Sequence, residues 1–400
     1  MVSSESLFQC STAPPDPILN LSVSYRADTD PRKVDLGVGA YRDENGRPFI
    51  FKSVRKAAEA IHNDPEDNHE YTTIDGHPKL KMCTLKVLFG EALAEEHCSR
   101  IVSSQALSGT GALRLASEFI ATHFNRPTVY VSDPTWSNHY SIFAKANLPV
   151  KTYPYWDAVE RKLNMEGLLS SLESAESGSV VLLHACAHNP TGCDPTPDEF
   201  KKIVQVILAR NLIALADTAY QGYASGDLEK DSFLVRELLV QGAEFFVTQS
   251  FAKNLGLYGE RFGMIHIVTA NAQVAAPVLS QLKLIIRPMY SSPPVYGAKL
   301  ALRVLSDSAL YEEWLTELVQ VSRRLRSMRI ALADRLEGDW SHIKTQIGMF
   351  SFTGLTPTQV DRMTSVWHVY MLRNGRISLA GLNSGNIDYV VQAINDCVKW

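Results

Sequence analysis

Between residues 100 and 270, short apolar runs alternate with stretches in which apolar and polar positions repeat at helical spacing. The apolar runs are continuous and rich in β-branched residues, which predicts strands buried on both faces. We expect these strands at residues 128–132, 179–184, 212–217, 244–249 and 263–268. Amphipathic helices are expected between them, for example at residues 197–210 and 231–241. The alternation predicts an α/β fold in which helices sandwich a mostly parallel central sheet.

The two ends of the chain have a different pattern. Residues 14–35 are rich in proline and have no apolar core of their own, so we expect an extended arm that packs on the C-terminal region or on a second subunit. A long charged helix is predicted at residues 311–336, followed by short strands at 347–353, 366–371 and 376–380 with helices around them. We therefore expect a large domain over residues 46–314, and a smaller α+β domain formed by residues 315–400 with part of residues 1–45.

The composition is that of a soluble globular protein, and 400 residues exceed what a single hydrophobic core usually supports. A formal net charge of −4 gives no electrostatic reason to expect nucleic acid or an anionic membrane as a partner. The six cysteines include no CxxC pair, which is typical of reduced intracellular thiols. No apolar stretch of about 18 residues is present and residues 1–12 lack a signal core, so a cytoplasmic protein is expected, with an organelle left open.

Polar side chains follow several predicted strands, at the end where ligands bind in parallel sheets. They are Trp136, His188 with Asn189, Asp217 with Tyr220, Ser250 with Lys253, and Arg261. Lys253 is the most informative, because a lysine at the end of a buried strand is partly desolvated and its pKa is lowered. Such a lysine can attack a carbonyl and form a Schiff base. The alternative is an ordinary solvated lysine in a surface loop.

Three further features have a chemical interpretation and a structural alternative. Small and hydroxyl residues at 108–114 open a helical pattern, which predicts either a phosphate site at the helix N-terminus or a plain helix cap. Arg261 would grip a phosphate bidentately or form a structural ion pair. Asp217 ends a buried run, where it would pair with the pyridinium nitrogen of a cofactor or cap the following turn.

Two other chemistries compete with these interpretations. His184, Cys186 and His188 alternate along a strand and share a face, as zinc ligands would, but a turn follows at once and no fourth ligand motif is present. We therefore expect them to support a cofactor site by hydrogen bonding. Ser250-x-x-Lys253 also matches the SxxK motif of serine acyl-transferases, but the chain has no Lys-Thr-Gly triad and its strand-helix alternation differs from that fold.

Three motifs together are specific for a known family: Ala-His-Asn-Pro-Thr-Gly at 187–192, Asp-Thr-Ala-Tyr-Gln-Gly at 217–222, and the segment from Ser250 to Arg261. With them, the chain from residues 36–42 to 376–382 resembles the eukaryotic-type aspartate aminotransferases, a class I family that depends on pyridoxal phosphate. The resemblance implies the fold of pyridoxal-phosphate-dependent transferases, with residues 46–314 as the cofactor-binding domain. It also implies a homodimer with shared active sites and ping-pong transfer of amino groups between aspartate with 2-oxoglutarate and oxaloacetate with glutamate.

The same resemblance implies a role for each site residue. The implied catalytic residues are Lys253, Asp217 and Tyr220, with Lys253 forming the Schiff base and moving the proton at the substrate Cα. The implied ligands of pyridoxal 5′-phosphate are Ser108, Gly109, Thr110, Trp136, Asn189, Asp217, Tyr220, Ser250, Lys253 and Arg261, with Tyr71 reaching the cofactor of the neighbouring subunit. The implied supporting histidines are His139, His184 and His188.

The implied substrate ligands are Gly39, Trp136, Asn189, Arg287 and Arg376. Arg376 would bind the α-carboxylate, and Arg287 would cross the dimer interface to bind the distal carboxylate, which favours small dicarboxylic amino acids and 2-oxo acids. Two alternatives stay open: an aromatic or broad-specificity aminotransferase on the same scaffold, and a non-catalytic binding protein that retains the fold. No metal, nucleic acid or membrane partner is expected.

Overall fold

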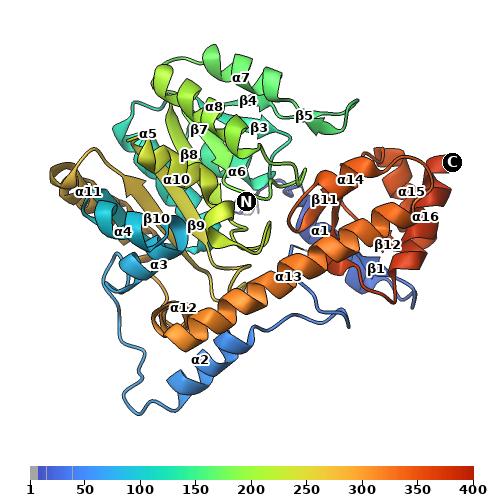
Figure 1. Cartoon of the computed structure of the whole chain (residues 1–400), viewed down its shortest axis with the longest axis horizontal. Helices are drawn as coiled ribbons and strands as arrows, with labels where there is room; N and C mark the ends of the chain where they lie inside the picture. Colours follow the sequence, from blue (N-terminus) through green and yellow to red (C-terminus); the bar gives the residue numbers. More distant parts are fainter. Residues whose placement is uncertain (1–7, 15, 38) are drawn as a thin grey trace, which may run out of the picture.

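The computed structural model describes residues 8–14, 16–37 and 39–400. Its main sheet has seven strands in the order β2-β10-β9-β8-β7-β3-β4, at the centre of the larger lobe in Figure 1. The strands are β2 Ile101–Leu107, β3 Val129–Asp133, β4 Val150–Pro154, β7 Val180–His184, β8 Ile213–Thr218, β9 Phe245–Ser250 and β10 Phe262–Val268. Neighbours pair in parallel except at β10, which is antiparallel to both β2 and β9. The mostly parallel sheet and the five predicted strands are therefore confirmed.

The sequence pattern does not predict β2 and β4. The centre of β2 is polar, yet Ser103, Ser104 and Gln105 are buried. Ser103 is accommodated because its hydroxyl lies 2.8 Å from Nδ1 of the buried His266 on β10. β4 is at the edge of the sheet, where β3 is its one partner among the described strands, and its side chains at 151 and 152 are exposed. Both strands contain polar residues, so a prediction that relies on apolar runs does not detect them.

Helices cover both faces of the sheet, as predicted (Figure 1). On one face lie α5 Ser108–His123, α6 Asn138–Lys145 and α11 Ala272–Tyr290. On the other lie α3 Leu80–Phe89, α4 Glu91–His97, α7 Met165–Glu173, α8 Pro197–Ala209 and α10 Phe233–Val240. Along β7, Val180 and Leu182 pack on the first face and Val181 and Leu183 on the second. This two-sided burial explains why the strands are continuously apolar.

The predicted helices begin and end close to their expected bounds. α8 starts at a capping box, in which Thr196 and Glu199 exchange hydrogen bonds between side chain and backbone. The helix predicted at 231–241 is α10, preceded by the short α9 Leu228–Asp231. Among the described residues, every helix is too short or too polar to cross a membrane.

The C-terminal region forms the smaller lobe. Its helices are α13 Ser308–Arg335, α14 Ser341–Thr345, α15 Pro357–Trp367 and α16 Ile387–Lys399, and its strands are β11 Phe350–Phe352, β12 Val369–Tyr370 and β13 Arg376–Ser378. The strand predicted at 366–371 is only partly correct, because α15 continues to Trp367. The helix ends at Trp367, and the next residue, His368, has a left-handed φ of 53°, as is common just after a helix.

The expectation of an extended arm at residues 14–35 is wrong. The segment contains the helix α1 Pro17–Ala27. Asp16 caps it by accepting the backbone N–H of Leu19 at 2.9 Å, and proline is favoured at the first helical position because its missing N–H has no partner to lose. Pro17 therefore begins a helix here.

The N-terminal arm packs on the C-terminal lobe of the same chain. β1 Val34–Asp35 pairs in parallel with β12, and the Asp28 carboxylate accepts hydrogen bonds from the Tyr370 hydroxyl at 2.8 Å and from His368. These contacts support the division into residues 46–314 and residues 1–45 with 315–400, which we propose for this chain. The boundary at 315 falls inside α13, which runs from the larger to the smaller lobe (Figure 1).

The remaining elements connect these layers. They are α2 Lys52–His62, α12 Tyr296–Ser306, β5 Trp156–Asp157, β6 Lys162–Leu163, and the 3₁₀ turns η1 Cys98–Arg100 and η2 Leu379–Gly381. α2 and α12 pack on the first half of α13, around the buried Trp314 and Leu318. α12 also contacts α3 of the larger lobe, and α13 contacts α14 and α16 of the smaller lobe, so these helices connect the two lobes.

Candidate active site

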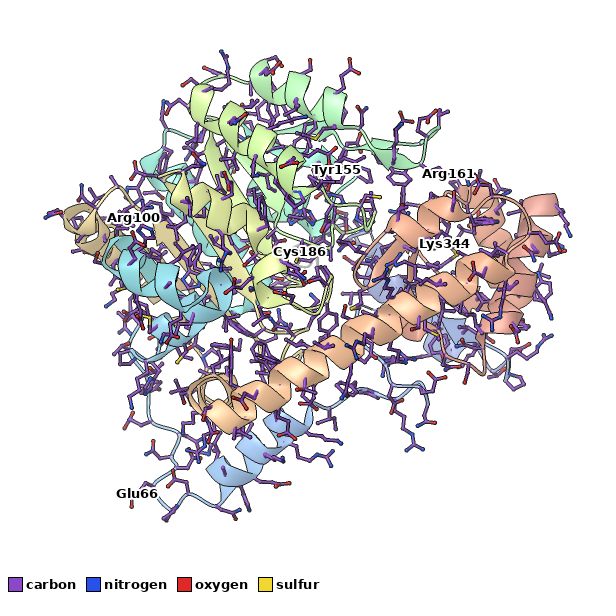
Figure 2. All side chains as sticks on the ribbon, viewed as in Figure 1. Glu66, Arg100, Tyr155, Arg161, Cys186 and Lys344 are labelled. Carbon is purple, nitrogen blue, oxygen red and sulfur yellow. The ribbon has the colours of Figure 1, made fainter. Side chains whose placement is uncertain are left out.

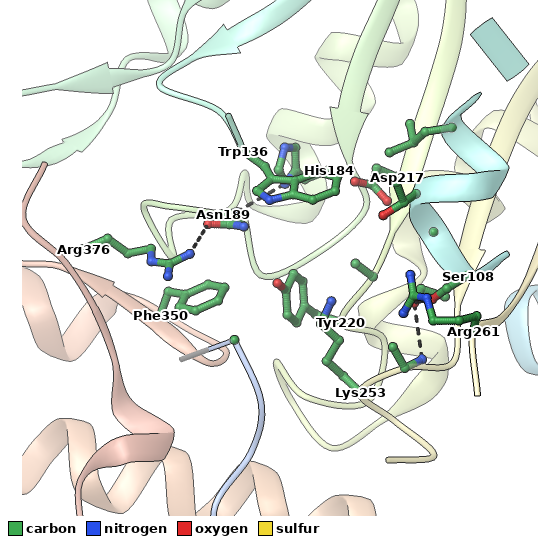
Figure 3. Close-up of a pocket in the computed structure, with 17 residues that line it drawn as sticks. Ser108, Trp136, His184, Asn189, Asp217, Tyr220, Lys253, Arg261, Phe350 and Arg376 are labelled. Atoms are coloured by element: carbon green, nitrogen blue, oxygen red, sulfur yellow. Dashed lines mark hydrogen bonds between the residues drawn. The ribbon is translucent and has the colours of Figure 1, made fainter. Parts of the chain in front are cut away.

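One cavity lies where the strands of the main sheet end. β2, β7, β8 and β9 all end at this edge, and the antiparallel β10 begins there. Arg376 from β13 and Phe350 from β11 close the cavity from the smaller lobe (Figure 3). The space extends over about 780 Å³, including the part open to solvent.

One end of the cavity is suited to an anion. Ser108 begins α5, whose N-terminus presents backbone N–H groups without helical partners. The Ser108 hydroxyl lies 3.0 Å from the Ser250 hydroxyl, and a Cβ on Gly109 would lie 3.2 Å from the Ser250 Cβ, so glycine keeps this space open. Arg261 lies on the same wall (Figure 3). Ser108 and Arg261 both have left-handed φ values, 59° and 54°, which are uncommon for residues other than glycine.

Lys253 lies in the middle of the cavity, in the loop after β9. Its ammonium nitrogen is 4.8 Å from the centroid of the Tyr220 ring (Figure 3). Burial lowers the pKa of Lys253 to about 8; the Asp217 carboxylate opposes this shift, and the positive charge of Arg261 adds to it. A pKa near 8 leaves part of the amine neutral at physiological pH, which attack on a carbonyl requires.

Asp217 lies near the end of β8 with its carboxylate held on two sides. Its Oδ2 is 3.1 Å from Nε2 of His139, and Thr248 donates to Oδ1 at 3.2 Å. Burial alone would raise the pKa of this carboxyl, but the hydrogen bond from His139 and the charge of Lys253 hold the pKa below its ordinary value. The ionised carboxylate can therefore pair with a cationic group in the cavity.

A chain of hydrogen bonds lies behind Asp217. Thr135 Oγ1 is 2.8 Å from Nδ1 of His139 and 3.4 Å from Nε2 of His184. The backbone N–H of Asn189 donates to Nδ1 of His184 at 3.3 Å, so the proton of His184 is on Nε2. Burial lowers the pKa of His184 to about 3, which keeps its ring neutral. This series of hydrogen bonds fixes the positions of Asp217 and Asn189 relative to each other.

Arg376 forms the other end of the cavity. Its side chain is only 2% exposed; Nη2 donates to the Gly37 carbonyl at 2.8 Å and Nη1 to Oδ1 of Asn189 at 3.3 Å. Burial lowers the pKa of Arg376 to about 10, so the guanidinium is charged at neutral pH. Its Nε has no hydrogen-bond partner among the described residues. A buried guanidinium with a free donor is suited to bind a carboxylate.

Most of the predicted site residues line this cavity. They are Gly39, Ser108, Gly109, Thr110, Trp136, His184, Asn189, Asp217, Tyr220, Ser250, Lys253, Arg261 and Arg376. His139 lies behind its wall in the hydrogen-bond chain, and the ring of His188 contacts that of His184, with centroids 4.2 Å apart. Tyr71, which is 86% exposed, and Arg287, exposed near the end of α11, lie outside the cavity of their own chain. Their action across a subunit interface stays a prediction.

The ring nitrogens of His188 are bound to hydroxyl groups. Nε2 lies 2.8 Å from Ser132 Oγ and Nδ1 lies 2.8 Å from Thr191 Oγ1, while the ring stacks on Tyr155 at 3.8 Å. Within residues 8–14, 16–37 and 39–400, no group of three or more His, Cys, Asp or Glu residues is arranged to hold a metal ion. The arrangement favours hydrogen-bonding support over zinc binding.

The SxxK interpretation is not supported by the position of Ser250. This serine ends a strand, whereas the nucleophile of SxxK enzymes opens a helix. Its hydroxyl is bonded to the Ser108 hydroxyl and accepts the backbone N–H of Ala252 at 3.3 Å. It therefore belongs to the anion-binding end of the cavity.

The lining residues that were not predicted as site residues are Leu113, Ala219, Ala252 and Phe350. Gly37 was not predicted either; it lies outside the lining but contacts Arg376. Phe350 contributes its ring beside Arg376, and the Gly37 carbonyl accepts a hydrogen bond from the same arginine. A signal existed for Gly37, which lies in the motif at 36–42. Phe350 lies in a predicted strand, but nothing in its local sequence distinguishes a cavity phenylalanine from a core one.

The geometry has a counterpart in known proteins. The sequence pattern described as aminotransferase class I and II matches residues 31–394. The chain belongs to this family. The match spans the whole region from which the resemblance was drawn, and the resemblance is confirmed.

Individual relatives agree over nearly the full length. The mitochondrial aspartate aminotransferase of Dictyostelium discoideum is 48% identical over 391 residues, 96% of this chain and 92% of that protein. The structure of cytoplasmic aspartate aminotransferase from Saccharomyces cerevisiae matches with a TM-score of 0.95 and 45% identity, covering 98% of both chains. An aromatic-amino-acid aminotransferase from Burkholderia pseudomallei, covalently bound to pyridoxal phosphate, matches with a TM-score of 0.94 and 40% identity over 98% of this chain and 100% of that one. These similarities confirm the predicted α/β fold.

Proposed function

We propose that the protein is a pyridoxal-phosphate-dependent aspartate aminotransferase, which exchanges amino groups between aspartate with 2-oxoglutarate and oxaloacetate with glutamate. The arrangement along one cavity is the observation that carries the proposal: an anion site at Ser108, an amine of lowered pKa at Lys253, and a buried guanidinium with a free donor at Arg376. Similarity to aspartate aminotransferases over nearly the whole chain supports it.

The groups in the cavity fit pyridoxal 5′-phosphate. The residues that would hold its phosphate are Ser108, Gly109, Thr110, Ser250 and Arg261. The Asp217 carboxylate would pair with the protonated ring nitrogen, Tyr220 and Asn189 would hydrogen-bond the ring oxygen, and Trp136 would stack on the ring. When bound, pyridoxal phosphate supplies an electron sink that stabilises negative charge at the substrate Cα.

Lys253 would have two roles. It would hold the cofactor covalently in the resting enzyme, and its freed amine would take the proton from the substrate Cα. A pKa of about 8 suits both roles, because a general base is most effective when its pKa is near the working pH. Burial raises the pKa of Tyr220, so its hydroxyl keeps its proton and can donate a hydrogen bond beside Lys253.

We propose a homodimer in which each subunit completes the other's site. Tyr71 and Arg287 are exposed and lie outside the cavity of their own chain, as residues that serve a neighbouring subunit would. Tyr71 of the partner subunit would bind the cofactor phosphate, and Arg287 of the partner subunit would bind the distal carboxylate. Two guanidinium groups, one for each carboxylate, select aspartate and glutamate over neutral amino acids.

The proposed compartment is the cytoplasm. The yeast relative is cytoplasmic and the Dictyostelium relative is mitochondrial. Fractionation of cells that express the full chain, with detection of the protein in each fraction, would decide.

Kinetics with two amino donors test the proposal. With 2-oxoglutarate as acceptor, kcat/KM should be about 100-fold or more higher for aspartate than for phenylalanine, because a site built for a charge rejects substrates that leave it unpaired. Comparable values for both donors would favour a broad-specificity enzyme. Failure to transaminate either donor, with no absorbance band from bound pyridoxal phosphate, would favour a non-catalytic protein.

A further inference from the structure

Phe350 covers one side of Arg376. Its ring is buried, and the Arg376 guanidinium carbon lies 4.2 Å from the ring centroid. Tyr220 meets the same ring nearly edge-on, with centroids 5.7 Å apart. Figure 3 shows the ring beside the guanidinium on the wall of the cavity. The ring thus restricts the directions in which Arg376 can point toward a bound carboxylate.

The backbone of Phe350 is held by a buried arginine from the long helix α13. Arg329 is only 2% exposed, and its Nη2 donates to the carbonyls of Gly348 and Phe350, both at 2.9 Å. Its Nη1 makes longer bonds to the Ile343 carbonyl, 3.4 Å, and to Oε1 of Gln346, 3.5 Å. A buried charge that is satisfied by neutral oxygens is costly compared with an apolar side chain of the same size. Stability therefore does not explain why an arginine occupies this position, whereas its two short hydrogen bonds to the backbone indicate a role in positioning that backbone.

The same segment is fixed on its opposite side by the loop that carries Asn189. The backbone N–H of Ile347 donates to the Gly192 carbonyl at 2.7 Å. At Gly348, an added Cβ would lie 2.4 Å from the Cβ of Ala187, so the segment cannot move closer to this loop. Arg329 therefore holds the segment at 347–350 on one side, and the loop at 187–192 limits its movement on the other.

Pairing of β11 with β13 connects this segment to Arg376. Phe350 is opposite Ser378, and Phe352 is opposite Arg376 itself. A shift of the backbone at 348–350 would therefore change where the Phe350 ring lies relative to the guanidinium two residues along the neighbouring strand.

We propose that Arg329 is a positioning residue for binding of the substrate α-carboxylate: it holds the backbone of Phe350 so that the ring orients Arg376. The inference rests on the proposed function, because it assigns to Arg376 the binding of a substrate carboxylate. Arg329 does not line the cavity itself; it contacts the lining residue Phe350 through the backbone carbonyl of that residue.

The test compares Arg329→Met and Arg329→Lys with a matched control, Arg100→Met. Arg100 also donates to two backbone carbonyls, those of Thr269 and Leu239, both at 3.1 Å. It lies at the opposite end of the sheet strands, far from the cavity (Figure 2). The measurements are KM and kcat for aspartate, the dissociation constant of succinate, which is aspartate without its amino group, the pyridoxal phosphate content and the Tm.

In Arg329→Met, KM for aspartate and Kd for succinate should rise roughly tenfold, while kcat and cofactor content change little, which is the pattern of lost ligand binding. Arg329→Lys should recover part of the affinity, because an ammonium can still reach one of the two carbonyls. Phe350→Leu should reproduce the loss of succinate affinity. Arg100→Met should lower Tm without changing either constant.

A lower kcat and cofactor content in Arg329→Met, with KM and Kd unchanged, would overturn the proposal, because that pattern indicates a general structural role. If Arg329→Met does not fold, normal succinate affinity in both Arg329→Lys and Phe350→Leu would overturn it. A wild-type protein that binds succinate but does not transaminate aspartate would contradict the proposed function. In that case the succinate affinities of the variants would still test whether Arg329 positions Arg376.

Discussion

Asp217→Asn tests the electrostatic coupling between Asp217 and Lys253. Burial lowers the pKa of Lys253 to about 8, and the Asp217 carboxylate limits this fall. At pH 7 an amine with a pKa of about 8 is roughly 10% neutral, whereas an ordinary lysine with a pKa near 10.4 is roughly 0.04% neutral. Burial thus raises the fraction of free amine about 200-fold. Removing the carboxylate should raise it further.

Reductive methylation of the cofactor-free protein measures this fraction. Formaldehyde and cyanoborohydride are applied in brief pulses from pH 6 to pH 10, and mass spectrometry follows the peptide that contains Lys253. The rate in the wild type should rise with a midpoint near pH 8, and the midpoint should be lower in Asp217→Asn. The exposed Lys151 on β4 gives an internal reference. Asp133→Asn, at an exposed carboxylate that ends β3, is the matched control and should leave the midpoint unchanged.

A wild-type midpoint near 10, or the same midpoint in Asp217→Asn, would refute the reasoning.

The dependence of stability on pH gives a second check of the lowered pKa of Lys253. Between about pH 8 and pH 10.4 the unfolded lysine keeps a proton that the folded lysine has lost. Lys253 therefore makes the free energy of unfolding of the cofactor-free protein rise with pH in this window.

Three substitutions test other parts of the site. Lys253→Ala should still bind pyridoxal phosphate through the phosphate site but lose transamination by several orders of magnitude; substantial turnover would contradict its role. Arg287→Leu should lower kcat/KM for aspartate more than 100-fold, which corresponds to about 3 kcal/mol, because a buried carboxylate loses its partner. The kcat/KM for apolar amino acids should change little; equal losses for both would show that Arg287 does not bind the distal carboxylate. Gly263→Ala places a Cβ 2.6 Å from the Gln249 carbonyl oxygen, so Tm and cofactor affinity should fall, whereas Gly259→Ala meets no atom within 4 Å and should be near neutral; equal Tm values would show that the sheet relaxes freely.

The sheet was predictable where burial and apolarity coincide. β7 and β8 are apolar on both faces because helices cover both, and this pattern is visible in the sequence. β2 was missed because Ser103 is satisfied by His266, a residue from a strand more than 150 positions away. No local pattern contains that partner, so tertiary context decides the strand.

The site was predictable where strand ends carry its residues. Lys253 and Asp217 are placed by strands whose ends the sequence predicts, so their convergence follows from the parallel sheet. Arg376 was assigned only by resemblance, because it comes from the other lobe and nothing local links it to Asn189. The depth of Arg376 and its contact with Phe350 depend on how the two lobes pack. Residues 14–35 were mispredicted because proline is favoured both in extended segments and at the start of a helix.

One absorbance titration tests the central claim most directly. The protein is reconstituted with pyridoxal phosphate, and aspartate is added without an acceptor, followed by 2-oxoglutarate. The account predicts that aspartate removes the long-wavelength band of the bound cofactor with stoichiometric release of oxaloacetate, and that 2-oxoglutarate restores the band with formation of glutamate. A protein that binds pyridoxal phosphate but whose band does not respond to aspartate would contradict the account.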